Sequence, residues 1–449
     1  MLGSCQDVSD VKENHDMPKQ IHLSGFMMFS PASHIPLSWI HPDKKIVHRW
    51  YEPQYWESVA NTLERGGFDM LFLGDSLHGG NTPDQIRYAI QFPVHDPVAL
   101  VTYLSATVKK LGFAVTMSTT FSPVFSLART LSTLDHLTQG RVGWNIVASF
   151  GTGEARNFGL DDLPPHDERY DRADEYMRAC YALWDSWEDN AMVMDMGQQV
   201  FADPAMVHRV DFNGRWYKTQ GPFTVVPSPR RRPFLFQAGR SERGKTFAAK
   251  HADGIFSVAR GWRQMRTFCD DIAGRAERNG RDPMSIPILW AAAPLVASSE
   301  AQARERYDEI RSRIPLEASL AQMSAHWDID LSKFDIDCSV SGLDVPGIKG
   351  LFEIYSKTDP DITLREIAKT YLSGGDRNPF VGTPTQVADA MQSFLEDGGG
   401  NGFQITPSYY APEYYADLVE LLVPVLKQRG IYRDNYVGTT LREHLTGKG

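Results

Sequence analysis

Polar side chains and one glycine lie in or just after short apolar runs along this 449-residue chain. They are Asp75, Thr120, Asn145, Gly239 and Ser241. A carboxylate, an amide and two hydroxyls can form several hydrogen bonds with a polar ligand. If the runs are parallel strands of one sheet, their carboxyl ends meet at one edge and bring these groups together. The set therefore favours a polar, hydrogen-bonding cofactor over a purely apolar ligand.

Each of these side chains also has a purely structural explanation. Asp75 is of the type that caps turns, and Thr120 is of the type that favours strands. Asn145 can satisfy backbone groups inside a barrel, and Ser241 can cap a helix. The residues alone leave both explanations open.

The segment around Ser241 has features of a phosphate site. Gly239 permits close approach of the backbone, and a helix that begins after Ser241 presents free N–H groups to an anion. Arg240, Arg243 and Lys245 add positive charge. These features favour a bound phosphate, with a plain helix cap as the alternative.

Several common catalytic motifs do not occur in the sequence. Gly151-Thr152-Gly153 follows an apolar run, but the dinucleotide fingerprint needs a third glycine where Arg156 stands. There is no HExxH, no His/Cys cluster with metal-ligand spacing and no GxSxG. We therefore predict no Rossmann site, no metal and no nucleophile elbow.

Three histidines lie where they can meet a ligand. His34 follows the first apolar run, and His326 lies in a long insertion. His166 precedes Tyr170 by four residues, so both share one face at a helix start. A lone histidine is more often structural than catalytic. Because a free imidazole titrates near neutrality, His34 or His326 is nevertheless a candidate acid or base.

The apolar runs alternate with amphipathic stretches, a rhythm typical of an α/β fold. In one such stretch Trp56, Val59 and Leu63 share a helix face. Eight short runs, nearly all followed by a helix, predict a (β/α)8 TIM barrel more than a doubly wound sheet. The runs are Ile21–Phe29, Met70–Leu73, Leu111–Thr116, Arg141–Val147, Pro233–Ala238, Gly254–Val258, Ile286–Val296 and Gly402–Thr406.

Residues 21–449 are predicted to form one barrel domain, after a disordered extension at 1–20. Insertions at about 191–232 and 316–382 break the rhythm, and we expect them over the C-terminal face of the strands. The first contains a hairpin signal, with Val207–Val210 and Trp216–Thr219 around Asn213-Gly214. The second is a candidate lid. Its possible hinges are Gly342, Gly347, Gly350, Gly374 and Gly375.

Composition excludes several classes of partner. The chain has 46 basic and 56 acidic residues and a net charge of −10, which argues against nucleic acid or an anionic membrane surface. No run reaches the roughly 18 apolar residues of a membrane helix. The four cysteines are scattered and form no CxxC pair. We expect a soluble, cytoplasmic protein.

Longer motifs resemble one family. Gly143–Ser149, Glu154–Gly159 and His166–Glu175 closely resemble the bacterial-luciferase-like flavin monooxygenases. The branch is that of nitrilotriacetate, EDTA and dibenzothiophene-sulfone monooxygenases. The likeness runs in order from about residue 21 to 446.

The resemblance implies a barrel that binds reduced FMN (FMNH2), supplied by a separate NAD(P)H:flavin reductase, and uses O2 as co-substrate. Carried over by position, Asp75, Thr120 and Asn145 lie near the isoalloxazine ring. His166 and Tyr170 reach the ribityl-phosphate arm, and Ser241, beside Gly239, holds the phosphate. Phe72, Phe256, His34 and His326 match positions on the substrate side, with barrel core as the alternative for the two phenylalanines and loop packing for the two histidines.

The chain departs from the family pattern at the strand ends. Ala148–Gly153 replaces a more polar loop, Phe121-Ser122-Pro123 replaces a more aromatic turn, and the loop from Ser76 to His95 differs in composition. These changes leave the flavin function intact and the substrate open.

The expected activity is oxidation of a small organic substrate, with cleavage of a C–S, C–N or C–halogen bond as in xenobiotic degradation. The alternatives are a deazaflavin-dependent oxidoreductase of the same superfamily and a non-catalytic flavin-binding protein. Relatives suggest a homodimer or homotetramer.

Overall fold

The computed structural model describes residues 20–448, except residues 33, 42–48, 229, 260, 358 and 372–377. The extension expected at 1–20 lies outside the described residues, apart from Gln20. Gly374 and Gly375 also lie outside them.

Eight parallel strands close into a barrel in the order β1-β14-β11-β10-β9-β4-β3-β2. This confirms the predicted (β/α)8 fold, and each strand falls within or overlaps one predicted apolar run. The strands are β1 (His22–Met28), β2 (Met70–Gly74), β3 (Gly112–Ser118), β4 (Val142–Val147), β9 (Phe234–Gln237), β10 (Gly254–Ser257), β11 (Ile288–Ala292) and β14 (Gly402–Ile405).

The run Ile286–Val296 does not form one strand. Only β11 joins the barrel, while β12 (Leu295–Val296) pairs with β13 (Val381–Gly382) in a separate two-stranded sheet. Pro294 has no N–H to donate to a ladder, and the N–H of Leu295 donates to the carbonyl of Phe380 instead.

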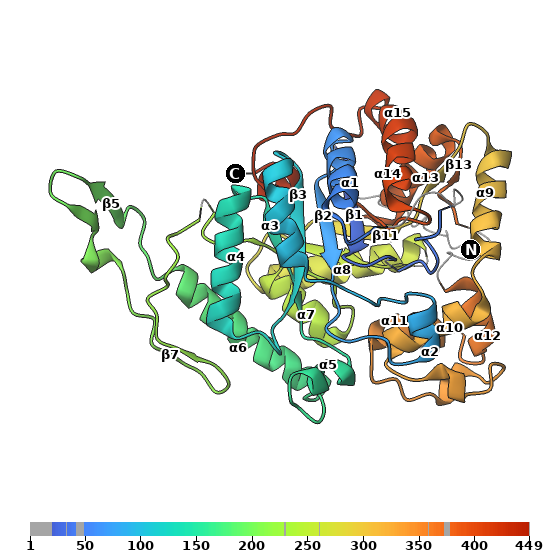
Figure 1. The fold of residues 1–449 in the computed structure, drawn as a ribbon, viewed down its shortest axis with the longest axis horizontal. Helices are drawn as coiled ribbons and strands as arrows, with labels where there is room; N and C mark the ends of the chain where they lie inside the picture. Colours follow the sequence, from blue (N-terminus) through green and yellow to red (C-terminus); the bar gives the residue numbers. More distant parts are fainter. Residues whose placement is uncertain are drawn as a thin grey trace, which may run out of the picture.

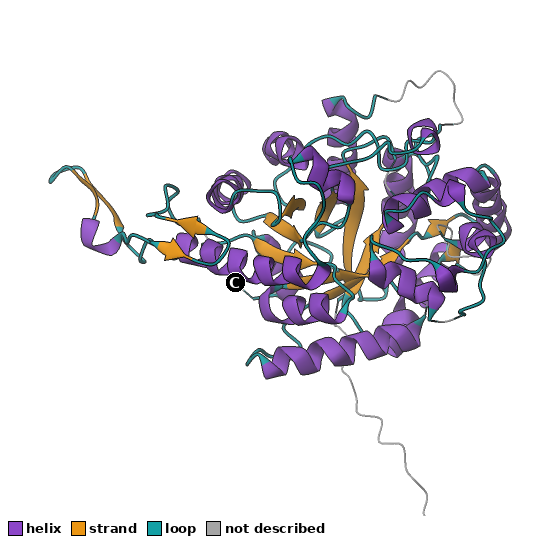
Figure 2. Ribbon diagram, turned by 90° about the horizontal axis from the view of Figure 1, so that it is seen from below, coloured by secondary structure: helices purple, strands orange, loops and turns teal. Residues whose placement is uncertain are grey.

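Helices cover the outside of the barrel (Figures 1 and 2). Each buries one apolar face against the strands, as Trp56, Val59 and Leu63 of α1 do. The outer helices are α1 (Pro53–Arg65), α3 (Pro97–Thr107), α4 (Val124–Thr138), α6 (His166–Trp184), α7 (Glu242–His251), α8 (Trp262–Arg278), α13 (Pro384–Gly398), α14 (Ala411–Asp417) and α15 (Val423–Gln428). Short helices α2 (Pro83–Arg87) and α5 (Thr152–Asn157) follow β2 and β4, and α9 (Glu300–Ser312) follows β12. Among the described residues, none of the helices combines the length and apolar character needed to cross a bilayer.

The C-terminal segment closes the amino end of the barrel. Leu441 and Leu445 of α16 (Leu441–Thr446) belong to the same apolar cluster as Met70 and Phe234, which point into the barrel. Close by, buried Asp69 accepts hydrogen bonds from the N–H of Leu23 (3.0 Å) and from the side chains of His22 and Arg433. Burial alone would raise the pKa of Asp69, but Arg433 and His22 hold it below its usual value.

The insertion at 191–232 forms two antiparallel ribbons. One joins β5 (Met192–Asp195) to β6 (Val200–Ala202), and the other joins β7 (Phe212–Asn213) to β8 (Lys218–Thr219). The second ribbon confirms the hairpin around Asn213-Gly214.

The prediction that Val207–Val210 forms the first strand of this hairpin is wrong, because strand pairing begins only at Phe212. Val207 bridges to Trp187 instead, and the N–H groups of Val210 and Asp211 both donate to Gln220. Because the insertion follows α6 rather than a strand, β5 and β6 project sideways from the barrel (Figure 1).

The insertion at 316–382 folds around a small core of its own. Met323 and Trp327 of α10 (Leu316–Trp327) pack with Leu364 and Ile367 of α12 (Leu364–Thr370). Helix α11 (Lys349–Ser356) lies between them in sequence. Gly347, proposed as a hinge, is tightly packed: its N–H donates to the carbonyl of Trp327 at 2.9 Å, and a Cβ there would overlap the same backbone.

Leu441→Ala tests the closure of the barrel by the C-terminal segment. Leu441 is fully buried, so the cavity left by its side chain should cost about 2–5 kcal/mol of unfolding free energy. Urea denaturation measures this cost. Val437→Ala, at a 62% exposed position in the same segment, is the control, and should change stability by no more than about 0.5 kcal/mol. Equal stabilities for the two variants would show that α16 is not part of the core.

Candidate active site

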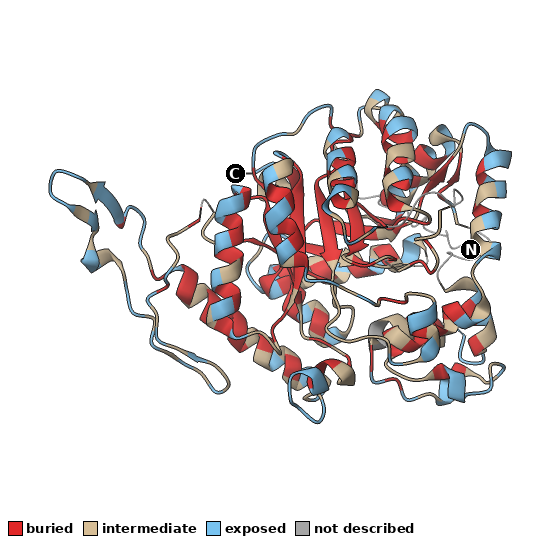
Figure 3. Ribbon diagram, in the orientation of Figure 1, coloured by how far each residue is buried: buried red, intermediate tan, exposed pale blue. Residues whose placement is uncertain are grey.

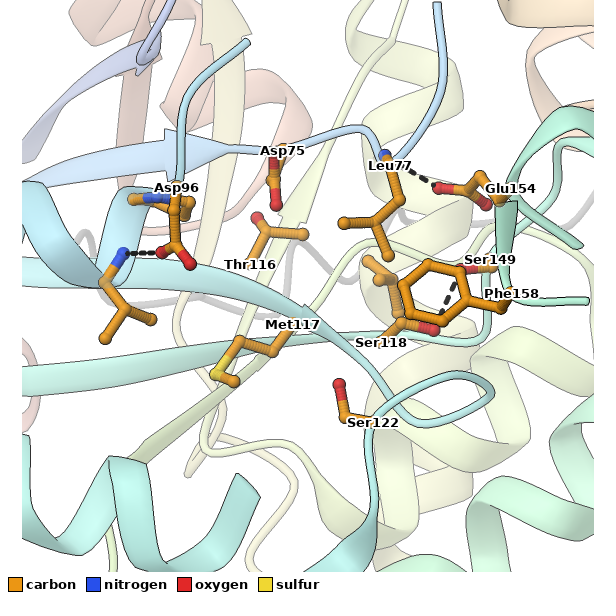
Figure 4. Close-up of a pocket in the computed structure, with 13 residues that line it drawn as sticks. Asp75, Leu77, Asp96, Thr116, Met117, Ser118, Ser122, Ser149, Glu154 and Phe158 are labelled. Carbon is orange, nitrogen blue, oxygen red and sulfur yellow. Dashed lines mark hydrogen bonds between the residues drawn. The ribbon is translucent and has the colours of Figure 1, made fainter. Parts of the chain in front are cut away.

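A small cavity opens where β2, β3 and β4 end (Figure 4). Its volume is about 150 Å³. Its lining combines carboxylates and hydroxyls with apolar side chains. The lining residues are Asp75, Leu77, Asp96, Pro97, Val98, Thr116, Met117, Ser118, Ser122, Val147, Ser149, Glu154 and Phe158.

Asn145 stands beside Thr116 on the neighbouring strand, with one half of its amide unused. Its Nδ2 donates to Thr116 Oγ1 at 2.9 Å, and that hydroxyl donates to the carbonyl of Leu73 at 2.8 Å. The Oδ1 of Asn145 is buried and has no hydrogen-bond partner among the described residues. A buried acceptor without a partner is costly. It is therefore available to an N–H or O–H group of a ligand.

Asp75 follows β2 and lines the same cavity. Its carboxylate accepts a hydrogen bond from the N–H of Ser76 at 2.9 Å. Burial, together with the nearby charges of Asp96 and Glu154, raises the pKa of Asp75 to about 7. A carboxyl group with this pKa can exist in either protonation state near neutral pH.

Two loops beside the cavity are tied together by Glu154. This buried carboxylate accepts hydrogen bonds from the N–H groups of Leu77, Phe150 and Gly151. A Cβ at Gly151 would overlap the imidazole of His78. The glycines of the unusual Ala148–Gly153 loop thus make room for His78.

Thr120 has a positioning role in the structure. Its hydroxyl donates to the carbonyl of Ala148 at 2.9 Å, and its N–H donates to Ser118 Oγ. Ser118 and Ser149 are themselves hydrogen-bonded at 2.9 Å. The turn after β3 is therefore fixed to the loop after β4, at the edge of the cavity.

A second cluster lies where β9 ends. Ser241 is the N-cap of α7, and its Oγ accepts a hydrogen bond from the N–H of Gly244 at 3.0 Å. The Tyr170 hydroxyl lies against Gly239 and Gly244 beside Ser241 Oγ, and burial raises its pKa. A Cβ at position 239 would come within 2.8 Å of that hydroxyl, so only glycine fits there.

His166 joins this cluster from the start of α6. Its ring lies edge-on to Tyr170 with centroids 5.2 Å apart, and its Nδ1 is 2.7 Å from Asp167 Oδ1. The structure thus brings together His166, Tyr170, Gly239 and Ser241, as predicted.

The charges near this cluster differ from the prediction. Arg243 forms ion pairs with Asp171 at 2.8 Å and Asp174 at 2.5 Å. Lys245 is paired with Glu242 and Asp271 at 2.6 and 2.5 Å. Both cations are therefore already neutralised.

Arg240 is different from these two cations. It forms no ion pair with any described residue. Its guanidinium lies 3.5 Å from Ser257 Oγ and over the ring of Phe268, and burial lowers its pKa. It is the cation of the predicted three that can still pair with an anion.

A third group consists of aromatic rings at the top of the barrel. Phe26 contacts Phe72, Phe256 and His34, with ring centroids 5.6, 5.2 and 4.8 Å apart. Phe72 and Phe256 also contact each other and belong to the apolar cluster inside the barrel. Phe26, Phe72 and Phe256 thus form one aromatic wall, and the ring of His34 lies against Phe26.

A chain of hydrogen bonds joins the two histidines. Gln91 Nε2 lies 2.7 Å from His34 Nδ1 and 2.6 Å from His326 Nε2. On the other side of the ring, His326 Nδ1 lies 2.7 Å from the Tyr371 hydroxyl. Since Gln91 follows β2 and His326 belongs to α10, these hydrogen bonds connect the 316–382 insertion to the barrel.

The protonation of these histidines differs from the sequence-based expectation. Burial lowers the pKa of His34 to about 4. Burial and the nearby His34 lower the pKa of His326 to about 3. Both rings are therefore neutral at physiological pH, in contrast to a free imidazole, whose pKa lies near neutrality.

Four residues of these clusters were not predicted as site residues from the sequence. Gln237 had a detectable signal, because it is a polar residue at the end of an apolar run. Gln91 and Tyr371 lie in irregular segments without periodicity, and Phe26 looked like any strand residue.

Comparison with known proteins decides the family. A family model described as luciferase-like monooxygenase matches residues 38–402. The chain belongs to the luciferase-like monooxygenase family. It is an oxidoreductase of the monooxygenase type.

Its relatives in this family act on different substrates. The luciferase-like chain is 38% identical to the long-chain alkane monooxygenase of Geobacillus thermodenitrificans, covering 96% of each chain. It is 36% identical to the dibenzothiophene-sulfone monooxygenase of Rhodococcus erythropolis, covering 95% of this chain and 96% of that protein. A crystal structure of a long-chain alkane monooxygenase superposes with a TM-score of 0.87, at 36% identity over 96% and 97% of the two chains.

The rim of this luciferase-like barrel suits an elongated ligand with different ends. The carboxyl group of Asp75 lies after β2, and the unpaired amide oxygen of Asn145 lies on β4. Together they would recognise a ring with N–H groups. A hydroxyl, a helix N-terminus and the unpaired Arg240 lie after β9, where an anion would be stabilised. Because β4 and β9 are neighbouring strands, both groups lie on the same rim of the barrel. These donors and acceptors fit FMN.

Asp75→Asn tests the raised pKa. The pKa of Asp75 rises from its ordinary value of 3.8 to about 7 in the folded protein. The native state therefore holds a proton that the unfolded chain releases. As pH rises from 4 through 7, the wild-type protein loses stability, which the amide variant retains. Asp75→Asn should be more stable by about 1–3 kcal/mol at pH 8.

This gain should shrink as the pH is lowered to 5 in urea denaturation experiments. Asp161→Asn, at an exposed site, is the control. A gain that does not change with pH would show that Asp75 titrates normally.

Proposed function

We propose that this chain is the oxygenase component of a two-component monooxygenase. It binds reduced FMN from a separate NAD(P)H:flavin reductase and uses O2 to oxidise a small organic substrate. The proposed reaction cleaves a C–S, C–N or C–halogen bond. We also propose a homodimer or homotetramer.

The observation that carries this proposal is the pair of complementary ends on one barrel rim. Asn145 Oδ1 is buried without a partner, and Asp75 lies on the adjoining cavity. These two groups would hold the flavin ring, and Thr120 would fix the loops beside it. His166 and Tyr170 would contact the ribityl-phosphate arm, and Ser241 and Arg240 would hold the phosphate beside Gly239.

A separate reductase is supported by two observations. The glycines at 151 and 153 surround His78, so this segment serves loop packing and does not resemble a nicotinamide-binding turn. Another relative, at 32% identity, is named nitrilotriacetate monooxygenase component A. That name belongs to one part of a multicomponent enzyme.

The protein's own contribution is to position groups and exclude water. When bound, reduced FMN supplies the electrons that activate O2. The aromatic wall of Phe26, Phe72 and Phe256 would keep the reacting region dry. His34 and His326, being neutral, would orient substrate through hydrogen bonds and exchange a proton only transiently. The 316–382 insertion would cover the site as a lid.

Oxygen consumption tests the proposed function. The purified chain is mixed with FMN, NADH, a flavin reductase and one member of a panel of sulfur, nitrogen and halogenated compounds. We expect substrate-dependent product formation, with less H2O2 released than in the absence of substrate. Product formation with a reduced deazaflavin but not with FMNH2 would favour the deazaflavin alternative. Flavin binding without any product across the panel would favour a non-catalytic protein.

Asp75→Ala and His326→Ala should affect different steps. Loss of the Asp75 carboxyl should weaken binding of reduced FMN about tenfold, the effect of roughly one good hydrogen bond. His326→Ala should leave that affinity unchanged and lower coupled turnover by about 10- to 100-fold. Anaerobic fluorescence titration measures binding, and product formed per NADH measures coupling. Undiminished coupling in His326→Ala would remove this histidine from the reaction.

A further inference from the structure

Two imidazoles face the same side-chain amide, that of Gln91. Its Nε2 lies 2.7 Å from His34 Nδ1 and 2.6 Å from His326 Nε2. Burial lowers the pKa of both rings, so each is neutral and has one N–H and one unprotonated nitrogen. The –NH2 group of a glutamine has two hydrogens and only donates. Each ring therefore accepts one of these hydrogens and carries its own hydrogen on the opposite nitrogen.

The other contacts of His326 agree with this assignment. Gln322, one turn earlier in α10, places its Nε2 2.8 Å from His326 Nε2. The Nδ1 of the same ring lies 2.7 Å from the Tyr371 hydroxyl. Two amides thus donate to Nε2, and Nδ1–H donates to the tyrosine oxygen. Both nitrogens of His326 are occupied, so this ring acts on a ligand only through Gln91 and His34.

The fold holds the amide of Gln91 firmly between the two rings. Helix α10 lies beside α2, a few residues before Gln91 (Figure 1), and Figure 3 shows most of α10 as buried. The side chain of Gln91 is itself buried. Its backbone has a φ of 47°, in the left-handed region that a long side chain rarely adopts. Strain of this kind persists only where the surroundings enforce it, and it is concentrated at functional sites.

His34 differs from His326 because one of its nitrogens is left over. Its Nδ1 accepts from Gln91, and its Nε2 has no hydrogen-bond partner among the described residues. The residue retains partial exposure. Its ring lies against Phe26, with centroids 4.8 Å apart. The Nε2–H group of His34 is therefore available to a ligand at the edge of the aromatic wall.

We propose that Gln91 fixes His34 as an uncharged hydrogen-bond donor, and that the substrate is an uncharged molecule with an apolar body and an acceptor oxygen. This inference rests on the proposed function, of which it names the substrate class. The aromatic wall would bury the apolar body. The Nε2–H of His34 would donate to the oxygen of a sulfone, sulfoxide or carbonyl group.

The same geometry disfavours two other classes of compound. An analogue without the oxygen would leave the buried N–H unpaired, which is costly. A polyanion would lose the hydration of several charges against three phenylalanine rings. Gln91 is accordingly a positioning residue, because it selects the substrate through the hydrogen that it fixes on His34.

Nuclear magnetic resonance tests the hydrogen positions on the flavin-free protein. In ¹⁵N-histidine-labelled protein, the nitrogen shifts distinguish a ring nitrogen that carries hydrogen from an unprotonated one. Loss of signals in His34→Ala and His326→Ala assigns the two rings. We expect hydrogen on Nε2 of His34 and on Nδ1 of His326. Hydrogen on Nδ1 of His34 would overturn the proposal, since the substrate would then meet an unprotonated nitrogen.

Gln91→Glu reverses the hydrogen bonds, because it replaces the –NH2 group with an oxygen that only accepts. Both rings should then turn an N–H toward residue 91. The matched control is Gln198→Glu, at an exposed site, which should leave both rings as in the wild type. Circular dichroism verifies that each variant is folded. The wild-type spectrum needs no variant and decides the hydrogen positions even if Gln91→Glu does not fold.

Calorimetric titration without oxygen, in the presence of reduced FMN, tests the substrate class. Methyl phenyl sulfone and methyl phenyl sulfide differ only in the two acceptor oxygens, and nitrilotriacetate represents the polyanions. The wild type and Gln198→Glu should bind the sulfone about tenfold or more tightly than either other compound. Gln91→Glu should lose most of the preference for the sulfone over the sulfide.

A wild type without the preference for the sulfone would overturn the substrate class. Oxygen consumption with reduced FMN, measured in parallel, separates this failure from failure of the proposed function. Continued oxygenation of another compound would reject only the present inference. Absence of reduced-FMN binding would reject the proposed function, and the inference that rests on it.

Discussion

The candidate site depends on the parallel pairing of four consecutive strands of the barrel. This pairing places the carboxyl ends of β2, β3, β4 and β9 next to one another on one rim. Asp75, Asn145 and Ser241, which are far apart in sequence, are brought together only through this arrangement. Backbone pairing such as Asn145 with Phe236 sets their relative height. A shift in register would separate the carboxyl and amide groups from the anion-binding end.

Electrostatics separates the groups that hold the fold from those left for a ligand. Arg243 and Lys245 have acidic partners, so they stabilise the helices around the rim. Arg240 and Asp75 have no ion partner among the described residues and carry the electrostatic cost of burial. Such uncompensated groups are more common at functional sites than elsewhere. Burial likewise keeps His34 and His326 neutral.

The strands were predictable because buried parallel strands are short continuous apolar runs, and all eight runs contribute one. Asp75, Asn145 and Ser241 were predictable because polar residues at strand ends interrupt those runs. The contact of Gln91 with His326 was not predictable, since it joins a loop to a helix 235 residues away in the sequence. The ion pairs of Arg243 and the low pKa values of His34 and His326 depend on tertiary packing and burial, which local pattern does not reveal. The sequence also predicted one continuous run over β11 and β12, because the pairing of β12 with β13 is a tertiary contact.

The central claim is that one ligand spans the rim, with its ring at Asp75 and its phosphate at Ser241 and Arg240. Anaerobic titration with reduced FMN and reduced riboflavin tests it directly, because these ligands differ only in the phosphate. The wild type should bind FMN at least tenfold more tightly than riboflavin. Arg240→Ala should lose most of that preference while its affinity for riboflavin stays the same. Equal affinities of the wild type for both ligands would contradict the account.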